Sequence, residues 1–459
     1  MCGIVGGWHP DIERGVDALS HRGPDARGII KLGALSLGHT RLAILDLDPR
    51  SDQPFTYGQT RLVFNGEIWN YKELRQELQG LGREFVTAGD TEVVAAALDT
   101  WGVEALPKMN GMFAIAWAKD DSTLFLARDR YGEIPLHIAK QRPFFFASEL
   151  KALKALGCAA QSFDDIQPGH YARVTMTGIQ QIAYYDISTR PQVIENGAAR
   201  KELFTLLQNG VTERTISDVP VCTLLSGGID SAAVAYFLKQ SFPALVAYIA
   251  VYNPKAADLR AAHQVAEFLS IELRSVRVPL PTTDDLRRVI RVIEMPYKAQ
   301  VEIGWPCLRL AEVMRADGFK VTFSGEGSDE LWASYGFAYH GLKKQGWHSY
   351  RKGLFLSQAQ KNFARCNKIF MAHSIECRLP FLNPSLVDFA ISLPQSVVQD
   401  GKSRPKAVLQ DAMRGYLPDA ITRRPKVAFQ DGMGIKEAIA QAISNPKRLY
   451  NVEYSHLYA

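Results

Sequence analysis

The sequence predicts two domains of different fold class, an α+β domain followed by an α/β domain with a parallel sheet. At 459 residues the chain exceeds the size of one typical hydrophobic core. Residues 1–190 contain mostly short β-type runs, whereas the residues after 200 alternate helix-like stretches with apolar strands. The polar segment 189–199, which contains Pro191, Asn196 and Gly197, is typical of a linker. We therefore expect domains at residues 2–190 and 200–459.

Short strands dominate the first of these domains. We predict them at residues 35–37, 61–64, 111–118, 124–128 and 144–147. Helical periodicity interrupts the strands at residues 71–81 and 91–102, and Pro168-Gly169 marks a turn near the end. In the second domain, apolar strands are expected at residues 221–225, 246–251 and 320–323. Because these strands alternate with helices, they predict a parallel sheet covered by helices.

Composition excludes several classes of protein. The net charge of +5 is spread over the whole chain, and no basic run carries interleaved aromatic residues, so a nucleic-acid partner is not expected. No stretch approaches about 18 uninterrupted apolar residues, and the N-terminus lacks a signal-peptide pattern, so no membrane partner is expected either. The six cysteines are scattered without a C-x-x-C pair, which argues against a disulfide framework or a zinc site and indicates a reducing cytoplasm.

Cysteine is the second residue of the chain. Its small side chain favours removal of Met1, which would make Cys2 the N-terminus. One residue would then carry a thiol nucleophile and an α-amine, and the amine titrates near ~7.7–8.0, so it can accept the thiol proton at neutral pH. This is a cysteine variant of the N-terminal nucleophile arrangement. Taken alone, a cysteine at position 2 is also consistent with chance.

Four fragments downstream could complete a site for attack on an amide, which requires oxyanion donors and a substrate clamp. They are the segments 21–25 (HRGPD), 41–46 (RLAILD), 65–70 (NGEIWN) and 89–92 (GDTE). Each also has a structural interpretation. Arg22 to Asp25 could form only a turn, Asn65-Gly66 is common in hairpin turns, and Asp90 could only cap the following helix.

Together with Cys2, these fragments resemble the class II glutamine amidotransferases, in which an N-terminal cysteine hydrolyses glutamine. The resemblance extends through residues 111–114, 128–132, 135–136 and 147–153. It implies an N-terminal-nucleophile domain with an αββα sandwich. It also implies that Cys2 attacks the glutamine amide and that the Asn65 side chain and the Gly66 backbone N–H hold the oxyanion. Glutamine would be bound by Arg41 at its α-carboxylate, by Glu67 and Asp90 at its α-ammonium, and by the backbone of Leu42, Ala43, Ile44 and Leu45.

The second domain contains a phosphate-binding motif. The sequence SGGIDS at 226–231 follows a predicted strand and opens a helix, so small residues let backbone N–H groups approach a phosphate. It is not a Walker A motif, because no G-K-[ST] follows. A second cluster, SGEGSDE at 324–330, also follows a predicted strand, where carboxylates beside ATP phosphates suit Mg²⁺. The segments 374–382 and 424–429 complete the pattern.

These motifs resemble the synthetase half of the glutamine-hydrolysing asparagine synthetases, over roughly residues 200–440. The resemblance implies an adenine-nucleotide-hydrolase-like fold that cleaves ATP to AMP and pyrophosphate. ATP would be bound by Leu225, Ser226, Gly227, Gly228, Asp230, Ser231, Val251, Ser324 and Gly325. Asp230 and Asp329 would bind Mg²⁺, and Glu326 would support formation of an acyl-adenylate. Lys426 would neutralise charge as ammonia attacks that adenylate. Glu376 is a further catalytic candidate, and the alternative for both Lys426 and Glu376 is a surface ion pair.

Some positions depart from the family pattern and leave the acceptor open. Ala333-Ser334 stands where the family usually has Gly-Gly, and residues 297–304 (YKAQVEIG) carry no arginine, so only Lys298 could pair with an acceptor α-carboxylate there. His137 replaces a usual tyrosine and is interpreted as packing.

The first hypothesis is a cytoplasmic, glutamine-dependent, AMP-forming amide ligase, most simply an asparagine synthetase. Its partners would be glutamine, ATP and a carboxylate, and a homodimer is left open. The alternatives are a relative that amidates another carboxylate in polysaccharide or secondary-metabolite biosynthesis, an N-terminal-cysteine hydrolase with a degenerate second domain, and a cyclising ligase of the β-lactam synthetase type.

Overall fold

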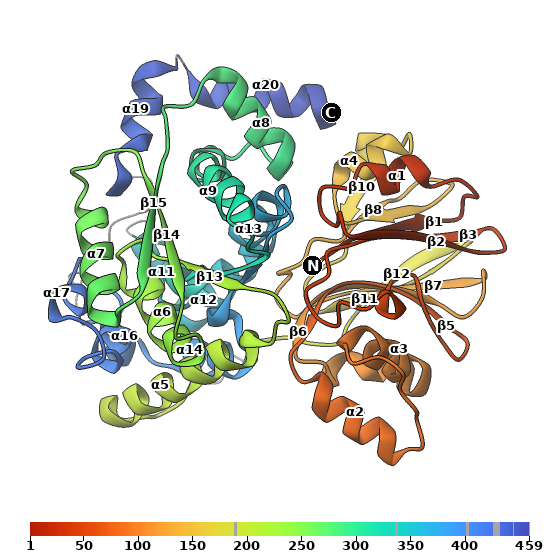
Figure 1. Ribbon diagram of the computed structural model, residues 1–459, viewed down its shortest axis with the longest axis horizontal. Helices are drawn as coiled ribbons and strands as arrows, with labels where there is room; N and C mark the ends of the chain where they lie inside the picture. Colours follow the sequence, from red (N-terminus) through yellow and green to blue (C-terminus); the bar gives the residue numbers. More distant parts are fainter. Residues whose placement is uncertain (188–190, 336–337, 401–403, 426–431, 444, 459) are drawn as a thin grey trace.

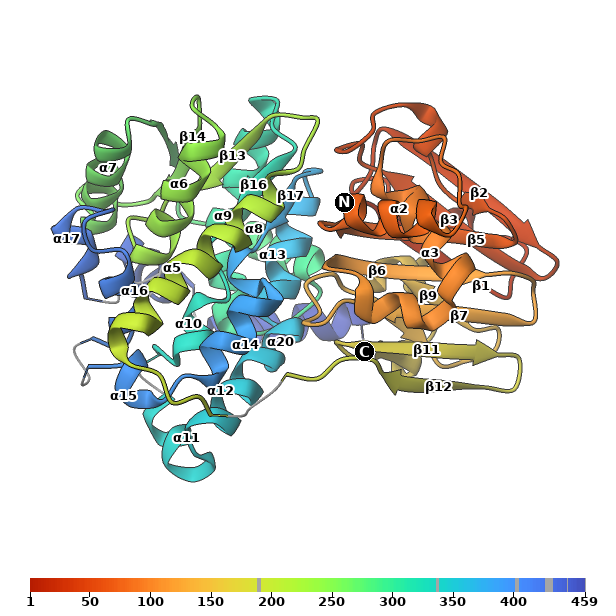
Figure 2. The same ribbon diagram turned by 90° about the horizontal axis from the view of Figure 1, so that it is seen from below.

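The computed structural model describes residues 1–187, 191–335, 338–400, 404–425, 432–443 and 445–458. Figures 1 and 2 show two halves lying side by side, with the N-terminus at the junction between them. The N-terminal half holds two antiparallel six-stranded sheets, and the C-terminal half holds one parallel five-stranded sheet.

The first antiparallel sheet has the order β10-β8-β9-β1-β3-β2. Its strands are β10 (Phe163–Asp165), β8 (His137–Ala139), β9 (Phe145–Ala147), β1 (Gly3–Gly7), β3 (Leu35–Arg41) and β2 (Ala26–Leu32). The second has the order β12-β11-β7-β6-β5-β4. Its strands are β12 (Gly178–Ala183), β11 (His170–Thr175), β7 (Thr123–Arg128), β6 (Gly111–Ala118), β5 (Thr60–Ile68) and β4 (Phe55–Tyr57).

The two sheets face each other, and helices cover their outer faces (Figure 1). Helices α1 (Glu13–Asp17) and α4 (Leu150–Ala155) lie on the first sheet, and α2 (Tyr71–Gly80) and α3 (Asp90–Trp101) lie on the second. Ile4 of β1 and Ala114 of β6 belong to one buried core between the sheets. Because β6 is covered on both faces, seven of its eight residues are buried. The αββα sandwich predicted for this half is therefore confirmed.

The parallel sheet has the order β15-β14-β13-β16-β17. Its strands are β15 (Glu272–Arg277), β14 (Val246–Val251), β13 (Val221–Leu224), β16 (Val321–Phe323) and β17 (Glu376–Arg378). The chain builds outward from β13 to β15, returns to the other side of β13 for β16, and then adds β17. The strand order therefore reverses beside β13, and the carboxyl ends of β13 and β16 border the crevice where such sheets bind ligands.

Helices cover both faces of this sheet, with α6 and α7 on one side and α9 and α13 on the other (Figure 1). This confirms the α/β class. The helices of this half are α5 (Asn196–Thr212), α6 (Ile229–Ser241), α7 (Ala257–Leu269), α8 (Thr283–Ile293), α9 (Lys298–Ala316), α10 (Ser328–Trp332), α11 (Ala338–Gln345), α12 (Trp347–Leu356), α13 (Asn362–Met371), α14 (Pro384–Ser392), α15 (Gln395–Val398), α16 (Ala407–Ala412), α17 (Asp419–Thr422), α19 (Ile435–Ala442) and α20 (Pro446–Tyr458). Among the described residues, no helix is both long enough and apolar enough to cross a lipid bilayer.

Charged side chains join the two halves. Glu294, at the end of α8, accepts hydrogen bonds from the backbone N–H groups of Leu150 and Lys151 in α4, at 2.9 and 2.8 Å. Lys368 of α13 donates to the same carboxylate at 2.5 Å. His137 lies here too, with Nδ1 2.5 Å from Asp165 Oδ1 and Nε2 3.2 Å from Lys368 Nζ. The interpretation of His137 as a packing residue is therefore wrong, since it joins an ionic network between the halves.

Candidate active sites

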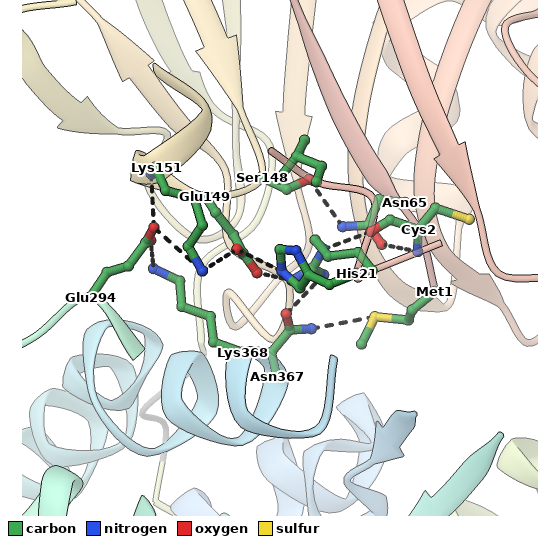
Figure 3. Close-up of polar contacts among 12 residues, drawn as sticks. Met1, Cys2, His21, Asn65, Ser148, Glu149, Lys151, Glu294, Asn367 and Lys368 are labelled. Carbon is green, nitrogen blue, oxygen red and sulfur yellow. Dashed lines mark hydrogen bonds and ion pairs between the residues drawn. The ribbon is translucent and has the colours of Figure 1, made fainter. Parts of the chain in front are cut away.

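Cys2 immediately precedes β1 and lies between the two antiparallel sheets. Its backbone N–H donates to Asn65 Oδ1 in β5 at 2.8 Å, and the Asn65 amide nitrogen lies 3.4 Å from Ser148 Oγ (Figure 3). Asn65 and Gly66 lie inside β5, so their interpretation as a hairpin turn is wrong. A Cβ at Gly66 would come 2.0 Å from the Met112 carbonyl oxygen, which explains why glycine occupies this position.

Met1 is buried at the junction of the two halves. Its ammonium group lies 2.6 Å from Glu376 Oε2. Burial lowers the pKa of this ammonium, but Glu376, Cys2 and Glu67 together raise it more strongly, so the net pKa is raised. Burial also raises the pKa of the Cys2 thiol, against the opposing effect of the N-terminal charge. The thiol therefore stays protonated at neutral pH and needs a base, which removal of Met1 would supply as the α-amine of Cys2.

Glu376 is fully buried in β17, and its second oxygen accepts from Arg378 Nε at 2.7 Å. Burial raises its pKa, but the N-terminal ammonium and Arg378 lower it more strongly, so the carboxylate is held ionised. The alternative of a surface ion pair is therefore wrong for Glu376. Although it belongs to the synthetase sequence motifs, it faces the nucleophile end of the N-terminal half. Lys426 lies outside the described residues.

Arg41 ends β3 beneath the loop of residues 46–52. Its Nη1 donates to Asp52 Oδ1 at 2.6 Å and to the Asp48 carbonyl at 3.0 Å, and its Nη2 donates to the Asp46 carbonyl. A guanidinium has five N–H groups, so, within the described residues, Nε–H and one Nη2–H remain for a ligand. A planar carboxylate suits these two donors.

Two acidic residues predicted to face a substrate ammonium, Glu67 and Asp90, are both buried. Asp90 Oδ2 accepts from the Ile68 backbone N–H at 2.9 Å, and Gly89 occupies the N-cap position, so the capping interpretation of Asp90 is wrong. Burial raises the pKa of Asp90 to about 6. Burial, Glu376 and Asp90 together raise the pKa of Glu67 well above its usual range. Crowded carboxylates of this kind favour a bound cation.

The loop after β3 contains the four residues predicted to line the glutamine pocket. The Ala43 backbone N–H donates to Asp25 Oδ2 at 2.8 Å, and Lys320, from the C-terminal half, contacts the same carboxylate at 2.7 Å. Leu42 and Ile44 are buried, whereas Ala43 and Leu45 are partly exposed. Asp25 is therefore not only a turn residue, because it holds this loop against the other half of the molecule.

The predicted phosphate loop connects β13 to α6 at the point where the strand order reverses. Ser231 Oγ accepts from the Ser226 backbone N–H at 3.1 Å and donates to the Gly228 carbonyl at 3.2 Å, which closes the loop. Gly227 has φ +76°, and a Cβ there would lie 2.5 Å from the Asp258 carbonyl oxygen. Glycine is therefore required at this position by both conformation and space.

The other predicted nucleotide contacts surround this loop. Ser226 and Val251 line one small pocket together with Asp258 and Met433. A Cβ at Gly325 would lie 2.9 Å from Asp230 Cβ, so the loops after β13 and β16 are in close contact. Ser324 is buried and accepts from the Glu326 backbone N–H at 3.3 Å. Leu225 is buried in the core, and its N–H pairs with the Tyr248 carbonyl at 2.9 Å.

Asp230 and Asp329, the two predicted metal ligands, converge on one cation of the chain. Lys406 Nζ lies 2.5 Å from Asp230 Oδ2 and 2.6 Å from Asp329 Oδ1. Two carboxylates that share one positive charge are a donor set suited to Mg²⁺. Lys406 also lines a pocket with Ser226, Gly228 and Arg424, where two cationic side chains suit a polyphosphate. Lys406 was not predicted as a site residue, because no motif surrounds it.

A polar network extends from Glu326 into the interior. Glu326 forms an ion pair with the buried Arg365 of α13, whose Nη1 donates to Gln300 Oε1 at 2.7 Å. Asn362 donates to Glu330 Oε1 at 2.7 Å. Burial, Asp329 and Glu326 raise the pKa of Glu330 to about 7. Arg365 and Gln300 were not predicted as members of this site.

The positions that depart from the family pattern have definite structures. Ala333 keeps a positive φ of +49°, although this conformation costs an ordinary residue about 1–2 kcal/mol. Ser334 Oγ donates to Asp329 Oδ1 at 2.5 Å. Both residues are buried beside Asp329. Lys298 lies 3.6 Å from Glu302 Oε1 in the same helix and is half-exposed.

Comparisons with known proteins agree with both half-sites. A family model described as a glutamine amidotransferase domain matches residues 1–201. A second, described as asparagine synthase, matches residues 202–363 and 342–448. Asparagine synthetase B (glutamine-hydrolysing) of Escherichia coli K12 is 30% identical over 453 residues, covering 93% of this chain and 81% of that protein. Asparagine synthetase 1 (glutamine-hydrolysing) of Arabidopsis thaliana is 30% identical over 466 residues, covering 94% and 78%. Asparagine synthetase 3 (glutamine-hydrolysing) of Bacillus subtilis is 26% identical over 539 residues, covering 94% and 87%.

Proposed function

The chain belongs to the asparagine synthase family of glutamine-dependent amide ligases, and from this premise we propose that it converts aspartate to asparagine. Glutamine would supply the nitrogen, and ATP would be cleaved to AMP and pyrophosphate. We place the glutaminase domain at residues 2–190 and the synthetase domain at residues 200–459.

The first reaction is hydrolysis of glutamine at Cys2. In the proposed step, the α-amine of processed Cys2 takes the thiol proton, and sulfur attacks the side-chain amide carbon. Asn65 and Gly66 stabilise the oxyanion, ammonia leaves, and water hydrolyses the thioester to glutamate. The two open donors of Arg41 would bind the glutamine carboxylate, and Glu67 and Asp90 would attract its ammonium group.

The second reaction activates the acceptor at the crevice beside β13. A carboxylate oxygen attacks the α-phosphorus of ATP, and pyrophosphate leaves into the loop of residues 226–231. Mg²⁺, held by Asp230 and Asp329, would neutralise phosphate charge when it is bound. Lys406 and Arg424 add positive charge from the protein. Ammonia then attacks the acyl-adenylate and releases AMP, with Lys426 as the proposed neutralising cation and Glu326 supporting the adenylate.

The observation that carries this proposal is the convergence of Asp230, Lys406 and Asp329 beside the intact phosphate loop. A plain N-terminal-cysteine hydrolase would need no such cluster. A different carboxylate acceptor is the second candidate. This candidate is favoured because Lys298, the cation expected to bind the α-carboxylate of aspartate, pairs instead with Glu302 in its own helix.

A product assay tests both candidates. The processed enzyme is incubated with ATP, Mg²⁺, glutamine and single carboxylic acids, and the amide and nucleotide products are identified. Asparagine with AMP and pyrophosphate supports the proposal. If an amide forms only from another acid, that acid replaces aspartate as the acceptor. If glutamate forms but ATP is unchanged with every acid, the protein is only a glutamine hydrolase.

A further inference from the structure

Arg22 connects the nucleophile to both halves of the molecule. This fully buried guanidinium donates through Nε to the Cys2 carbonyl at 2.8 Å and through Nη1 to Glu149 Oε1 at 2.7 Å. Its Nη2 donates to Asn367 Oδ1 at 3.0 Å. Cys2 and Glu149 belong to the N-terminal half, whereas Asn367 belongs to helix α13 of the C-terminal half. A side chain that fixes the nucleophile backbone is therefore held in part by the synthetase half.

Helix α13 contacts both candidate sites. Arg365 pairs with Glu326 beside the phosphate loop, and Asn367, two residues later, contacts Arg22. Successive residues of a helix are about 100° apart, so these two side chains leave nearly opposite faces. The helix thus lies between the two sites, and a small shift or rotation of α13 changes the contacts at both.

The next residue of α13 fixes its position against the N-terminal half. Lys368 donates to Glu294 at 2.5 Å, and Glu294 accepts from the first two backbone N–H groups of α4. Figure 3 shows Asn367 and Lys368 on one helix. Asn367 points toward Met1 and Cys2, whereas Lys368 points toward Glu294 and Lys151. The contact is polar and directional, so it can transmit a displacement of α13.

We propose that Asn367 is a positioning residue that orients Cys2 through Arg22, and that α13 makes glutamine hydrolysis respond to the adenylation site. The second part rests on the proposed function. An acceptor carboxylate that enters beside Glu326 competes with Glu326 for Arg365, since the acceptor and Glu326 are both anions. The weakened Glu326–Arg365 pair lets α13 move, and Asn367 carries that movement to Arg22 and the nucleophile.

The positioning role is tested with two variants of Asn367 and a control on the same helix. Asn367→Leu keeps the size of the side chain but removes the acceptor oxygen, whereas Asn367→Asp retains that oxygen. Because a hydrogen bond from a charged donor is lost, we expect Asn367→Leu to lower kcat/KM for glutamine about 10- to 100-fold. Asn367→Asp should restore most of it. Ile369→Val, which loosens the packing of α13 without touching Arg22, should stay near wild type.

Ammonium-driven amide synthesis serves as the internal control and should be unchanged in all three variants. Wild-type glutaminase activity in Asn367→Leu would overturn the positioning role. A loss of glutaminase activity in Asn367→Asp as large as that in Asn367→Leu would also overturn it, because the acceptor oxygen would then make no difference.

Coupling is tested by measuring glutamine hydrolysis with and without ATP, Mg²⁺ and aspartate. The wild-type rate should rise when all three are present, and the rate of Asn367→Leu should not respond. An unresponsive wild type that nevertheless forms amide from ammonium would overturn the coupling. Failure of the wild type to form amide from ammonium with any acid would refute the proposed function instead, and the comparison of Asn367→Leu with Asn367→Asp would still decide the positioning role.

Discussion

Replacing Lys406 with methionine should damage both stability and adenylation. Its Nζ lies 2.5 Å from Asp230 Oδ2 and 2.6 Å from Asp329 Oδ1, so these carboxylate oxygens are at most about 5 Å apart. Two unit charges at that separation repel by about 3 kcal/mol at an effective dielectric constant of about 20. Because both aspartates retain some exposure, we expect a destabilisation of about 2–3 kcal/mol, from the repulsion that Lys406 no longer offsets.

The assays are thermal unfolding and pyrophosphate exchange. For a domain of this size, a stability lower by about 2–3 kcal/mol corresponds to a Tm lower by about 4–10 °C. Millimolar Mg²⁺ should restore part of it by replacing the lost positive charge. Exchange should fall about 100-fold or more, because Lys406 also faces the phosphate pocket.

Lys108→Met is the matched control. Lys108 pairs with Glu77 at 2.7 Å on the surface, so its loss should change stability by less than about 1 kcal/mol. A Lys406→Met protein with the Tm and exchange rate of this control would refute the reasoning.

Three further predictions use the same activities. Cys2→Ala should abolish glutamine-dependent synthesis and leave ammonium-driven synthesis at elevated pH. Equal loss of both activities in a folded protein would contradict their assignment to separate sites. Asp230→Ala should abolish amide formation and retain glutaminase activity, and loss of both activities would argue against separate sites. Burial raises the pKa of Asp90 to about 6, so this carboxylate attracts the glutamine ammonium above pH 6 and is neutralised below it. The kcat/KM for glutamine should therefore fall about tenfold per pH unit below 6, and a profile flat to pH 5 would remove Asp90 from substrate binding.

Regular elements with strong patterns were predictable from the sequence. Strands β14 and β6 are both continuous apolar runs, and their bounds could be predicted because this pattern is contained within a few neighbouring residues. Strand β1, with the sequence GIVGG, was not predicted, because glycine has low strand propensity and only pairing with β3 and β9 fixes it. Strand β2, with the sequence ARGIIKL, has no buried residue, and it was missed because only pairing with β3 fixes it.

The residues of the candidate sites likewise fall into those that a local motif predicts and those that only tertiary contacts reveal. Cys2 and the phosphate loop belong to contiguous motifs, so the sequence contains their signal. Lys406, Arg365 and Asn367 have no motif of their own, and their importance depends on tertiary contacts with residues 39 to 345 positions away. Glu376 lies in a recognisable segment, but its contact with the N-terminal ammonium joins residues 375 positions apart in the sequence.

Transfer of labelled nitrogen tests the central claim most directly. Processed enzyme is supplied with ATP, Mg²⁺, an acceptor acid and glutamine carrying ¹⁵N in its side-chain amide, together with excess unlabelled ammonium. If both sites act in one molecule, the amide product contains ¹⁵N above the level of the mixed ammonia pool, with one AMP and one pyrophosphate formed per amide. Formation of ADP and phosphate, or glutamate release without any amide product, would contradict the account.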